Sequence, residues 1–513
     1  MLNIKTSLFL ACACLSTVIY ANETPEPNRS NTLSIAGSLE FTNIDPSSNG
    51  YLFTRMQVIE TLLNVNPQGQ LLPALAKSYH VSNGGKTWLF SLNDNIKFHD
   101  GQTMDANVVV QSLIRARSKH GPLNNVPILS IHAIENQKIE ITLSRPYRPL
   151  GAVLAHYSTA IIGSESYDNN GKIVRLNGTG PYQIDQLAPP HKITVKRFAD
   201  YWGDVASIEY ATYLTGHRAE SRALQVTSGQ ADIAYELSPT STIRMKMQPH
   251  IKVHDISLPR TLVIKLNSGD PLLNDVRARQ ALSLSIDRQG IANGVLRTPG
   301  AETSQLLPET AKNWYLTEYA APNYNIDKAQ QLLSDLGWTK NENGILIRNG
   351  APFELTLITY ADRPELTNVA TAIQAQWRRL GVQLKVNITN SSAIPSGHND
   401  GSLQVALIAR NYGVIADPLA VLSNDFSPTG GDWGAMNWND PSLNALFNKL
   451  NITNDPNEYH QLAQQAAEKI HHGYALLPIA SYTQRVGVNQ RVQDFHFDPY
   501  ERQFPINKME LSH

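Results

Sequence analysis

The feature that most limits the fold of this chain is a regular alternation of helical and extended patterns between residues 268 and 477. Amphipathic helical patterns and apolar strand patterns follow one another here, at 275–296, 323–338, 352–360, 368–380, 382–388, 403–409 and 458–471. Such alternation is typical of α/β proteins, in which helices cover a sheet. We therefore predict an α/β lobe in this part of the chain.

The first half of the chain carries the same mixture. Alternation near residue 90 puts Trp88, Phe90 and Leu92 on one face, which predicts a half-buried strand. Asp105 is placed as the N-cap of a helix. The apolar positions expected in that helix are Val108, Val109, Leu113 and Ile114. Because 513 residues exceed what one hydrophobic core usually serves, we expect at least two lobes.

The N-terminus has the pattern of an export signal. Lys5 provides a basic start, residues 8–20 an apolar core, and Ala21 a cleavage site, so residues 1–21 are predicted to be a signal peptide. Cys12 and Cys14 both lie inside this segment, without the leucine that a lipid-attachment motif favours three residues earlier. After cleavage, we predict a mature protein without cysteine, located in the periplasm. The formal net charge of −1 gives no reason to expect nucleic acid as a partner.

The sequence contains no recognisable catalytic motif. There is no HExxH, GxSxG or GxxxxGK[ST] pattern. His471 and His472 are adjacent, so on a helix they point about 100° apart and do not readily face one ion. His99, His120 and His156 are isolated in sequence, which favours ordinary surface or interior roles. We predict a binding protein, not an enzyme, without a cofactor and with its metal ligands unknown.

Several segments together resemble one known family. In order, they are LLPALAKSYHVSNGGKTWLFSLNDNIKFHDGQTMDANVVVQSLIRA (71–116), NGTGPYQI (177–184), FADYWG (198–203), DVRARQALSLSIDR (275–288), NYNIDKAQQLLSDLGW (323–338), NWNDPSLNALFNKL (437–450) and ALLPIASY (475–482). The chain resembles the peptide/nickel/opine solute-binding proteins of ABC importers, the family 5 extracellular solute-binding proteins.

This resemblance implies an architecture. Its members have the α/β, two-lobed periplasmic binding protein fold of class II type, with an extra subdomain in lobe I and a ligand cleft between the lobes. Carried over, residues 22–258 are the N-terminal part of lobe I, 259–477 are lobe II, and 478–513 return to lobe I. The implied partner is an ABC permease in the inner membrane, and the protein itself is expected to be a monomer.

The same resemblance suggests residues of the cleft. Tyr51 and Phe53 fall where lobe I lines the pocket in the family, with core aromatics as the alternative. Arg260, at the first crossover, would suit a carboxylate, because its planar fork binds one bidentately, or else an ion pair between the lobes. Tyr360 ends a strand, and strand ends often face the cleft in α/β folds.

Residues 409–418 distinguish the branches of the family. Peptide-binding members carry an aspartate before the proline-bearing turn, where this chain has Val414 and retains only Asp417. Because valine cannot neutralise an ammonium, the segment resembles the nickel-type branch, with an aromatic residue at Tyr412. The histidine expected further on in that branch is replaced near Gly430. A chelated metal would need carboxylate-binding and aromatic side chains more than protein ligands. Residues that fit such a pocket are Arg410, Tyr412, Trp433 and Trp438.

The sequence thus predicts a periplasmic solute-binding subunit of an ABC importer. Its ligand is either a short peptide or an amino-acid-derived metal chelate, with nickel as the candidate metal. The alternatives are an exported peptide hydrolase, which lacks its motifs here, and a periplasmic sensor or chaperone that uses the same fold without transport.

Overall fold

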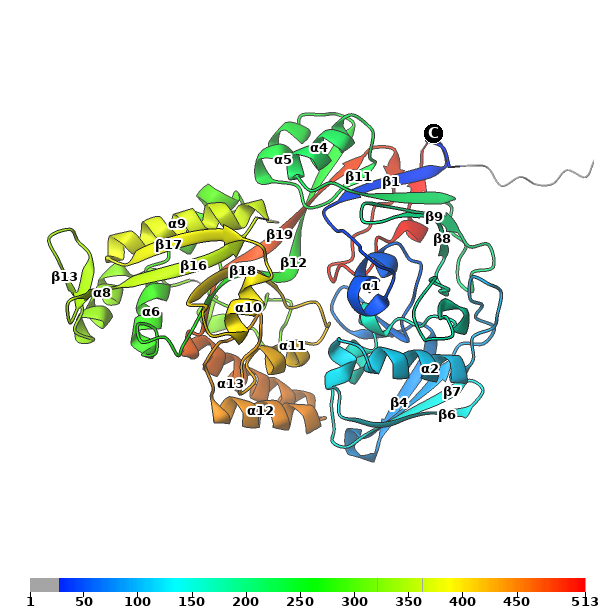
Figure 1. Cartoon of the computed structure of the whole chain (residues 1–513), viewed down its shortest axis with the longest axis horizontal. Helices are drawn as coiled ribbons and strands as arrows, with labels where there is room; N and C mark the ends of the chain where they lie inside the picture. The colour runs from blue at the N-terminus through cyan, green and yellow to red at the C-terminus, as the bar shows by residue number, and fades with distance from the viewer. Residues whose placement is uncertain (1–26, 321, 362, 513) are drawn as a thin grey trace, which may run out of the picture.

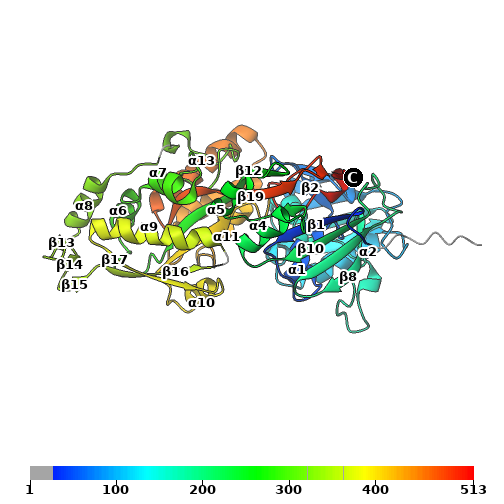
Figure 2. The ribbon, with the colours of Figure 1, turned by 90° about the horizontal axis from the view of Figure 1, so that it is seen from above.

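The computed structural model describes residues 27–320, 322–361 and 363–512, so the predicted signal peptide and both cysteines lie outside the described residues. The chain forms two bodies that lie side by side (Figure 1 and Figure 2). Two long strands join them, β12 (Ile251–Leu266) and β19 (Leu476–Asn489). We call the body that contains β1 (Thr32–Gly37) lobe I and the other body lobe II.

One ten-stranded sheet runs through both lobes, in the order β17-β16-β18-β12-β19-β11-β1-β10-β9-β8. β12 and β19 are antiparallel neighbours at its centre, and their pairing shifts register between Ser257 and Thr261. Ile256 packs against the cores of both lobes, whereas Leu258 is buried in the core of lobe II. The predicted boundaries at 258/259 and 477/478 therefore fall inside strands that both lobes share, and the exact division stays a prediction.

Lobe II contains the predicted alternation of helices and strands. Its core extends from Leu258 to Tyr482 in sequence and includes the fully buried Trp377. Asn325, Asp440 and Asp455 cap three of its helices by accepting hydrogen bonds from backbone N–H groups. The elements are α6 (Val276–Leu284), α7 (Arg288–Gly290), α8 (Ile326–Asp335), β13 (Thr339–Lys340), β14 (Leu346–Arg348), β15 (Ala351–Pro352), β16 (Glu354–Tyr360), α9 (Pro364–Leu380), β17 (Gln383–Thr389), α10 (Ala393–Asn399), β18 (Val405–Asn411), α11 (Pro418–Asp425), α12 (Pro441–Ile452) and α13 (Pro456–Gly473).

Lobe I holds the other half of the large sheet. β1 runs parallel to β10 and β11, so the C-terminal ends of these strands lie at one edge. Glu236, which follows β11 at this edge, lies 3.9 Å from Arg363 of lobe II. The elements are α1 (Pro46–Arg55), β2 (Leu63–Val65), β3 (Leu71–Pro73), α3 (Leu150–Val153), β8 (Tyr182–Ala188), β9 (Lys192–Arg197), β10 (Tyr210–Thr215), α4 (Ala219–Thr227), β11 (Ile233–Ala234), α5 (Pro239–Met245), β20 (Val492–Gln493) and β21 (Glu510–Leu511).

A separate four-stranded sheet forms a subdomain of lobe I. Its strand order is β4-β5-β7-β6, and it packs with helix α2. The bounds are β4 (Ala76–Ser82), β5 (Thr87–Leu92), α2 (Ala106–Arg117), β6 (Ile128–Glu135) and β7 (Lys138–Leu143).

The sequence prediction for this subdomain is mostly confirmed. Trp88, Phe90 and Leu92 are the buried face of β5. Asp105 caps α2 by accepting a hydrogen bond from the Val108 N–H. Ile114 is the exception, because its side chain is 44% exposed instead of contributing to the core. Among the described residues, the helices are all too short or too polar to cross a bilayer.

Candidate functional site

The candidate site lies between the lobes, around Arg260 at the register shift of β12. Arg260 is 5% exposed, and its Nη2 donates to Oε2 of Glu501 over 2.5 Å. Nε and Nη1 of Arg260 are buried and have no hydrogen-bond partner in the structure. A buried donor without a partner is costly, so this guanidinium can donate to further acceptors, one at Nε and one at Nη1, on either side of the bond to Glu501.

Glu501 is the acidic centre of this cluster. It lies in the C-terminal segment that packs against lobe I, and its Oε1 is 3.7 Å from Nη2 of Arg55 in α1. Burial alone would raise the pKa of the Glu501 carboxyl, but Arg260, Arg55 and Arg363 outweigh it and hold that pKa below its ordinary value. Glu501 is therefore ionised and links lobe I to the strand that enters lobe II.

A second contact between the lobes lies beside the first. Arg363, just before α9, donates from Nη1 to the Tyr482 hydroxyl over 2.8 Å. Nη2 of Arg363 is 3.9 Å from Oε1 of Glu236, which follows β11 in lobe I. The guanidiniums of Arg260 and Arg363 lie 5.0 Å and 5.1 Å from the centre of the Tyr482 ring. Tyr482 thus contacts two cations at the crossover, each of which also faces a carboxylate.

The lobe I side of the site is aromatic. Tyr235 is buried and stacks on Phe504, with ring centres 4.7 Å apart. Its hydroxyl has no hydrogen-bond partner in the structure, and neither has Oε1 of the buried Gln484. These two side chains therefore add unused polar groups to an otherwise apolar wall.

Two small cavities flank this cluster. One, beside Tyr482 and Arg363, has a volume of about 30 Å³, and the other, beside Glu501 and Tyr235, about 10 Å³. A water molecule needs roughly 10–15 Å³ on this scale. The cavities hold water-sized molecules only, so a larger ligand requires the lobes to move apart.

Arg410 has its main bonds inside lobe II. Its Nε and Nη2 atoms donate to the two carboxylate oxygens of Asp425 over 2.7 Å and 2.5 Å. Asp425 is fully buried, so this bidentate pair neutralises a carboxylate that water does not reach. The structure brings Arg410 to the same strand end as Asn411, which pairs with Arg260, but the fork of Arg410 already has a partner.

The predicted aromatic residues of lobe II lie near this edge. Tyr412 is 2% exposed, its hydroxyl lacks a hydrogen-bond partner, and burial raises its pKa well above the ordinary value. Tyr360 ends β16, and its hydroxyl accepts a hydrogen bond from the Ala409 N–H over 3.2 Å. Trp433 is half-buried and packs edge-to-face on Tyr360 with ring centres 6.2 Å apart.

Three predicted residues lie elsewhere. Tyr51 is half-buried in α1, where its hydroxyl donates to the Glu40 carbonyl oxygen and its ring packs on Tyr157. Phe53 is fully buried and packs on Phe41 in the lobe I core, the alternative that the sequence left open. Trp438 packs edge-to-face on Phe426 within lobe II.

Several residues of the cluster were missed by sequence reasoning. Glu236, Arg363 and Glu501 come from loops and Gln484 from within β19, far apart in the chain, and no local pattern marks them. Tyr482 had a signal, because it ends the segment 475–482 that carried part of the resemblance.

Of the isolated histidines, His156 is buried and His99 is half-buried. Burial lowers the pKa of His156 to about 3 and that of His99 to about 4. His156 is satisfied locally, because Nδ1 accepts from the Ser158 N–H. His471 and His472 both contact Tyr319, by stacking and by a hydrogen bond respectively.

Comparison with known proteins places this arrangement in context. The family model described as "Bacterial extracellular solute-binding proteins, family 5 Middle" matches residues 70–433. The nickel-binding protein NikA of Staphylococcus aureus is 29% identical over 445 residues, which cover 86% of each chain. The dipeptide-binding protein of Escherichia coli is 25% identical over 465 residues, 84% of each chain.

A solved structure extends the likeness to the fold. The crystal structure of S. aureus NikA in complex with Ni(L-His)2 has a TM-score of 0.80 and 24% identity, and the match covers 94% of this chain and 100% of that one. This likeness confirms the predicted α/β periplasmic binding protein fold.

Proposed function

The chain belongs to the bacterial extracellular solute-binding proteins of family 5, and on this premise we propose that its cleft captures a small carboxylate-bearing ligand, an amino-acid chelate of nickel. The family consists of binding subunits of ABC importers and not of enzymes, so the predicted class of protein is confirmed. The choice of ligand is our proposal.

The two unused donors of Arg260 carry this proposal. Nε and Nη1 are buried beside an ionised glutamate and have no hydrogen-bond partner. A ligand carboxylate would accept a charge-assisted hydrogen bond from one of these donors, and a second polar group of the ligand could accept from the other. Tyr235 and Phe504 would provide the aromatic wall on the lobe I side, and Tyr482, Tyr360, Tyr412 and Trp433 that on the lobe II side.

The residues around the 412–418 loop favour a chelate over a free peptide. Val414 offers no charge to a peptide amine. The Asp417 carboxylate accepts a hydrogen bond from the Leu419 N–H and caps α11, and burial raises its pKa. A carboxylate used in this way is a poor partner for an ammonium group. A short peptide remains the second candidate, because a dipeptide-binding relative covers most of the chain.

We further propose that the protein is an exported monomer that closes on its ligand and is then recognised by an ABC permease. The small cavities require opening before a ligand enters, and the contacts Arg260–Glu501 and Arg363–Glu236 would form again on closure. Such hinge closure is the common behaviour of two-lobed receptors.

Calorimetric titration tests the choice of ligand. The titrants are the nickel complex of L-histidine, L-histidine alone, nickel chloride alone, and a mixed set of di- and tripeptides. We expect tight, saturable binding of the complex and weak binding of its components. Binding of peptides at least tenfold tighter than binding of the complex would overturn the chelate proposal and favour the peptide.

A further inference from the structure

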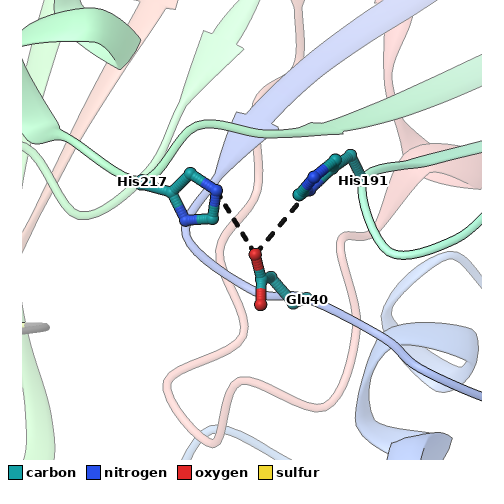
Figure 3. A group of neighbouring side chains, drawn as sticks. All are labelled: Glu40, His191 and His217. Atoms are coloured by element: carbon teal, nitrogen blue, oxygen red, sulfur yellow. Dashed lines mark ion pairs between the residues drawn. The ribbon is translucent and has the colours of Figure 1, made fainter. Parts of the chain in front are cut away.

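Three metal-binding side chains meet at the surface of lobe I, outside the cluster around Arg260. Glu40 follows β1, His217 follows β10, and His191 lies in the turn between β8 and β9. Because β1 and β10 are parallel and β9 is antiparallel to β10, these three loops share one edge of the sheet. Figure 3 shows both imidazoles pointing toward the same carboxylate.

The distances fit a coordination sphere. Oε1 of Glu40 lies 3.3 Å from Nε2 of His217 and 3.7 Å from Nδ1 of His191. One ligand atom from each residue lies within 4.8 Å of the other two. Around a tetrahedral ion with bonds of about 2.0–2.1 Å, ligand atoms are separated by about 3.3 Å. Small side-chain rotations would therefore complete the site without backbone movement.

The loops that carry these residues are bonded to one another. The Gly216 N–H donates to the Gly37 carbonyl over 2.8 Å, and the Thr215 N–H donates to the His191 carbonyl over 2.8 Å. The buried Arg222 donates from Nη1 to the His217 carbonyl over 3.2 Å. Hydrogen bonds to neighbouring loops thus hold the backbone near these three side chains. Less conformational entropy is therefore lost when the side chains bind an ion.

We propose that Glu40, His191 and His217 bind one divalent transition-metal ion, with Zn²⁺ as the reference ion. Two imidazoles and one carboxylate form a donor set typical of zinc and related metals, and water would fill the open positions. Within the part of the chain that the structure describes, this is the one group of three such side chains that comes together. Its side chains are 43–65% exposed, so an ion can reach it without opening of the lobes.

The test uses the purified exported protein without a polyhistidine tag, after removal of metal with a chelator. Zinc chloride alone is titrated by calorimetry, and cobalt chloride is titrated with visible absorption as a readout of direct coordination. We expect one ion per chain. His191→Ala, His217→Ala and Glu40→Gln should each weaken zinc binding at least about tenfold, because loss of a side chain that only orients a metal ligand already costs about that much. His120 is exposed and lies outside this group, so the control variant His120→Ala should bind zinc as the parent does.

Stability measurements separate loss of the site from loss of the fold. Without metal, all variants should melt at the temperature of the parent, and zinc should raise the melting temperature of the parent but not that of the His191→Ala/His217→Ala double variant. Tight zinc binding by that double variant would overturn the proposal, as would no zinc binding by the parent. Loss of zinc binding in Arg260→Ala, with the histidine variants unaffected, would place the ion in the cleft and would also overturn it.

Discussion

Nη2 of Arg260 lies 2.5 Å from Oε2 of Glu501, although 241 positions separate the two residues. Arg260 belongs to the strand that enters lobe II, and Glu501 lies in the segment that returns to lobe I. Their ion pair therefore joins the two lobes, and it leaves Nε and Nη1 of Arg260 without partners.

Replacing Arg260 with alanine should weaken binding of a carboxylate-bearing chelate. Loss of a buried charge-assisted contact costs about 2–5 kcal/mol, which is more than tenfold in affinity. Arg260→Lys should retain more affinity than Arg260→Ala but less than the parent, because lysine keeps the charge and lacks the planar guanidinium. Calorimetry with the nickel–histidine complex measures the effect, and the exposed Arg378→Ala is the control. Parent-like affinity in Arg260→Ala would contradict the proposed anchor.

Replacing Arg410 should mainly lower the free energy of unfolding of the protein. Arg410→Ala leaves the fully buried Asp425 without its bidentate partner, and breaking such a pair costs about 3–5 kcal/mol. The double variant Arg410→Ala/Asp425→Asn should be less destabilised than the single variant, because no charge is left buried. Urea unfolding measures both. If Arg410→Ala unfolds like the parent but loses the ligand, Arg410 contacts the ligand directly.

Replacements of Trp433 and of Trp438 should differ in their effects on affinity and stability. Trp433 is half-buried on Tyr360 near the strand ends, so Trp433→Ala should lower ligand affinity with a modest effect on stability. Trp438 is also half-buried but packs on Phe426 and against Gly473, so Trp438→Ala should destabilise lobe II more than Trp433→Ala does. Calorimetry and urea unfolding on both variants separate these effects. Equal loss of affinity in both would mean that Trp438 also lines the site.

The lobes should open in the absence of ligand. Because the cavities at the crossover hold only water-sized molecules, a chelate has to enter an open form. Small-angle scattering should show a smaller radius of gyration after saturation with a tight ligand. Arg363→Ala removes the contacts to Tyr482 and Glu236 and should shift the unliganded protein further toward the open form. A radius of gyration that is unchanged by a tight ligand would exclude hinge closure.

Stability should fall in mild acid because of buried histidines. Burial lowers the pKa of His156 from 6.5 to about 3, so between these values only the unfolded chain takes up this proton. The free energy of unfolding then falls by about 1.4 kcal/mol per pH unit as the pH drops below 6.5. His156→Asn keeps an acceptor for the Ser158 N–H but does not titrate.

Urea unfolding at pH 7.5 and pH 5.0 measures this effect. The loss of stability between the two should be about 2 kcal/mol smaller in His156→Asn than in the parent. An equal loss in both proteins would show that His156 does not titrate in this way.

Local patterns predicted much of the fold. The buried face of β5, the Asp105 cap and the alternation in lobe II each depend on residues close in sequence, and side-chain periodicity reports them directly. The prediction that Ile114 contributes to the core was wrong, because periodicity does not show how far the neighbouring elements extend around a helix. The family followed from segments in a fixed order, because each segment preserves a local structure.

The contacts around Arg260 and the group of Glu40, His191 and His217 could be found only from the tertiary structure. The sequence named Arg260 and both of its alternatives, a carboxylate ligand and an ion pair, but only the fold brings Glu501 to it and leaves Nε and Nη1 without partners. Glu40, His191 and His217 have no common motif, because three separate loops meet at one sheet edge. Contacts of this kind are set by strand order and by the crossing of the chain between lobes, neither of which a local pattern encodes. The sequence by itself determined the class of protein and its elements, and the tertiary structure decided which charged groups are paired and which are left to bind.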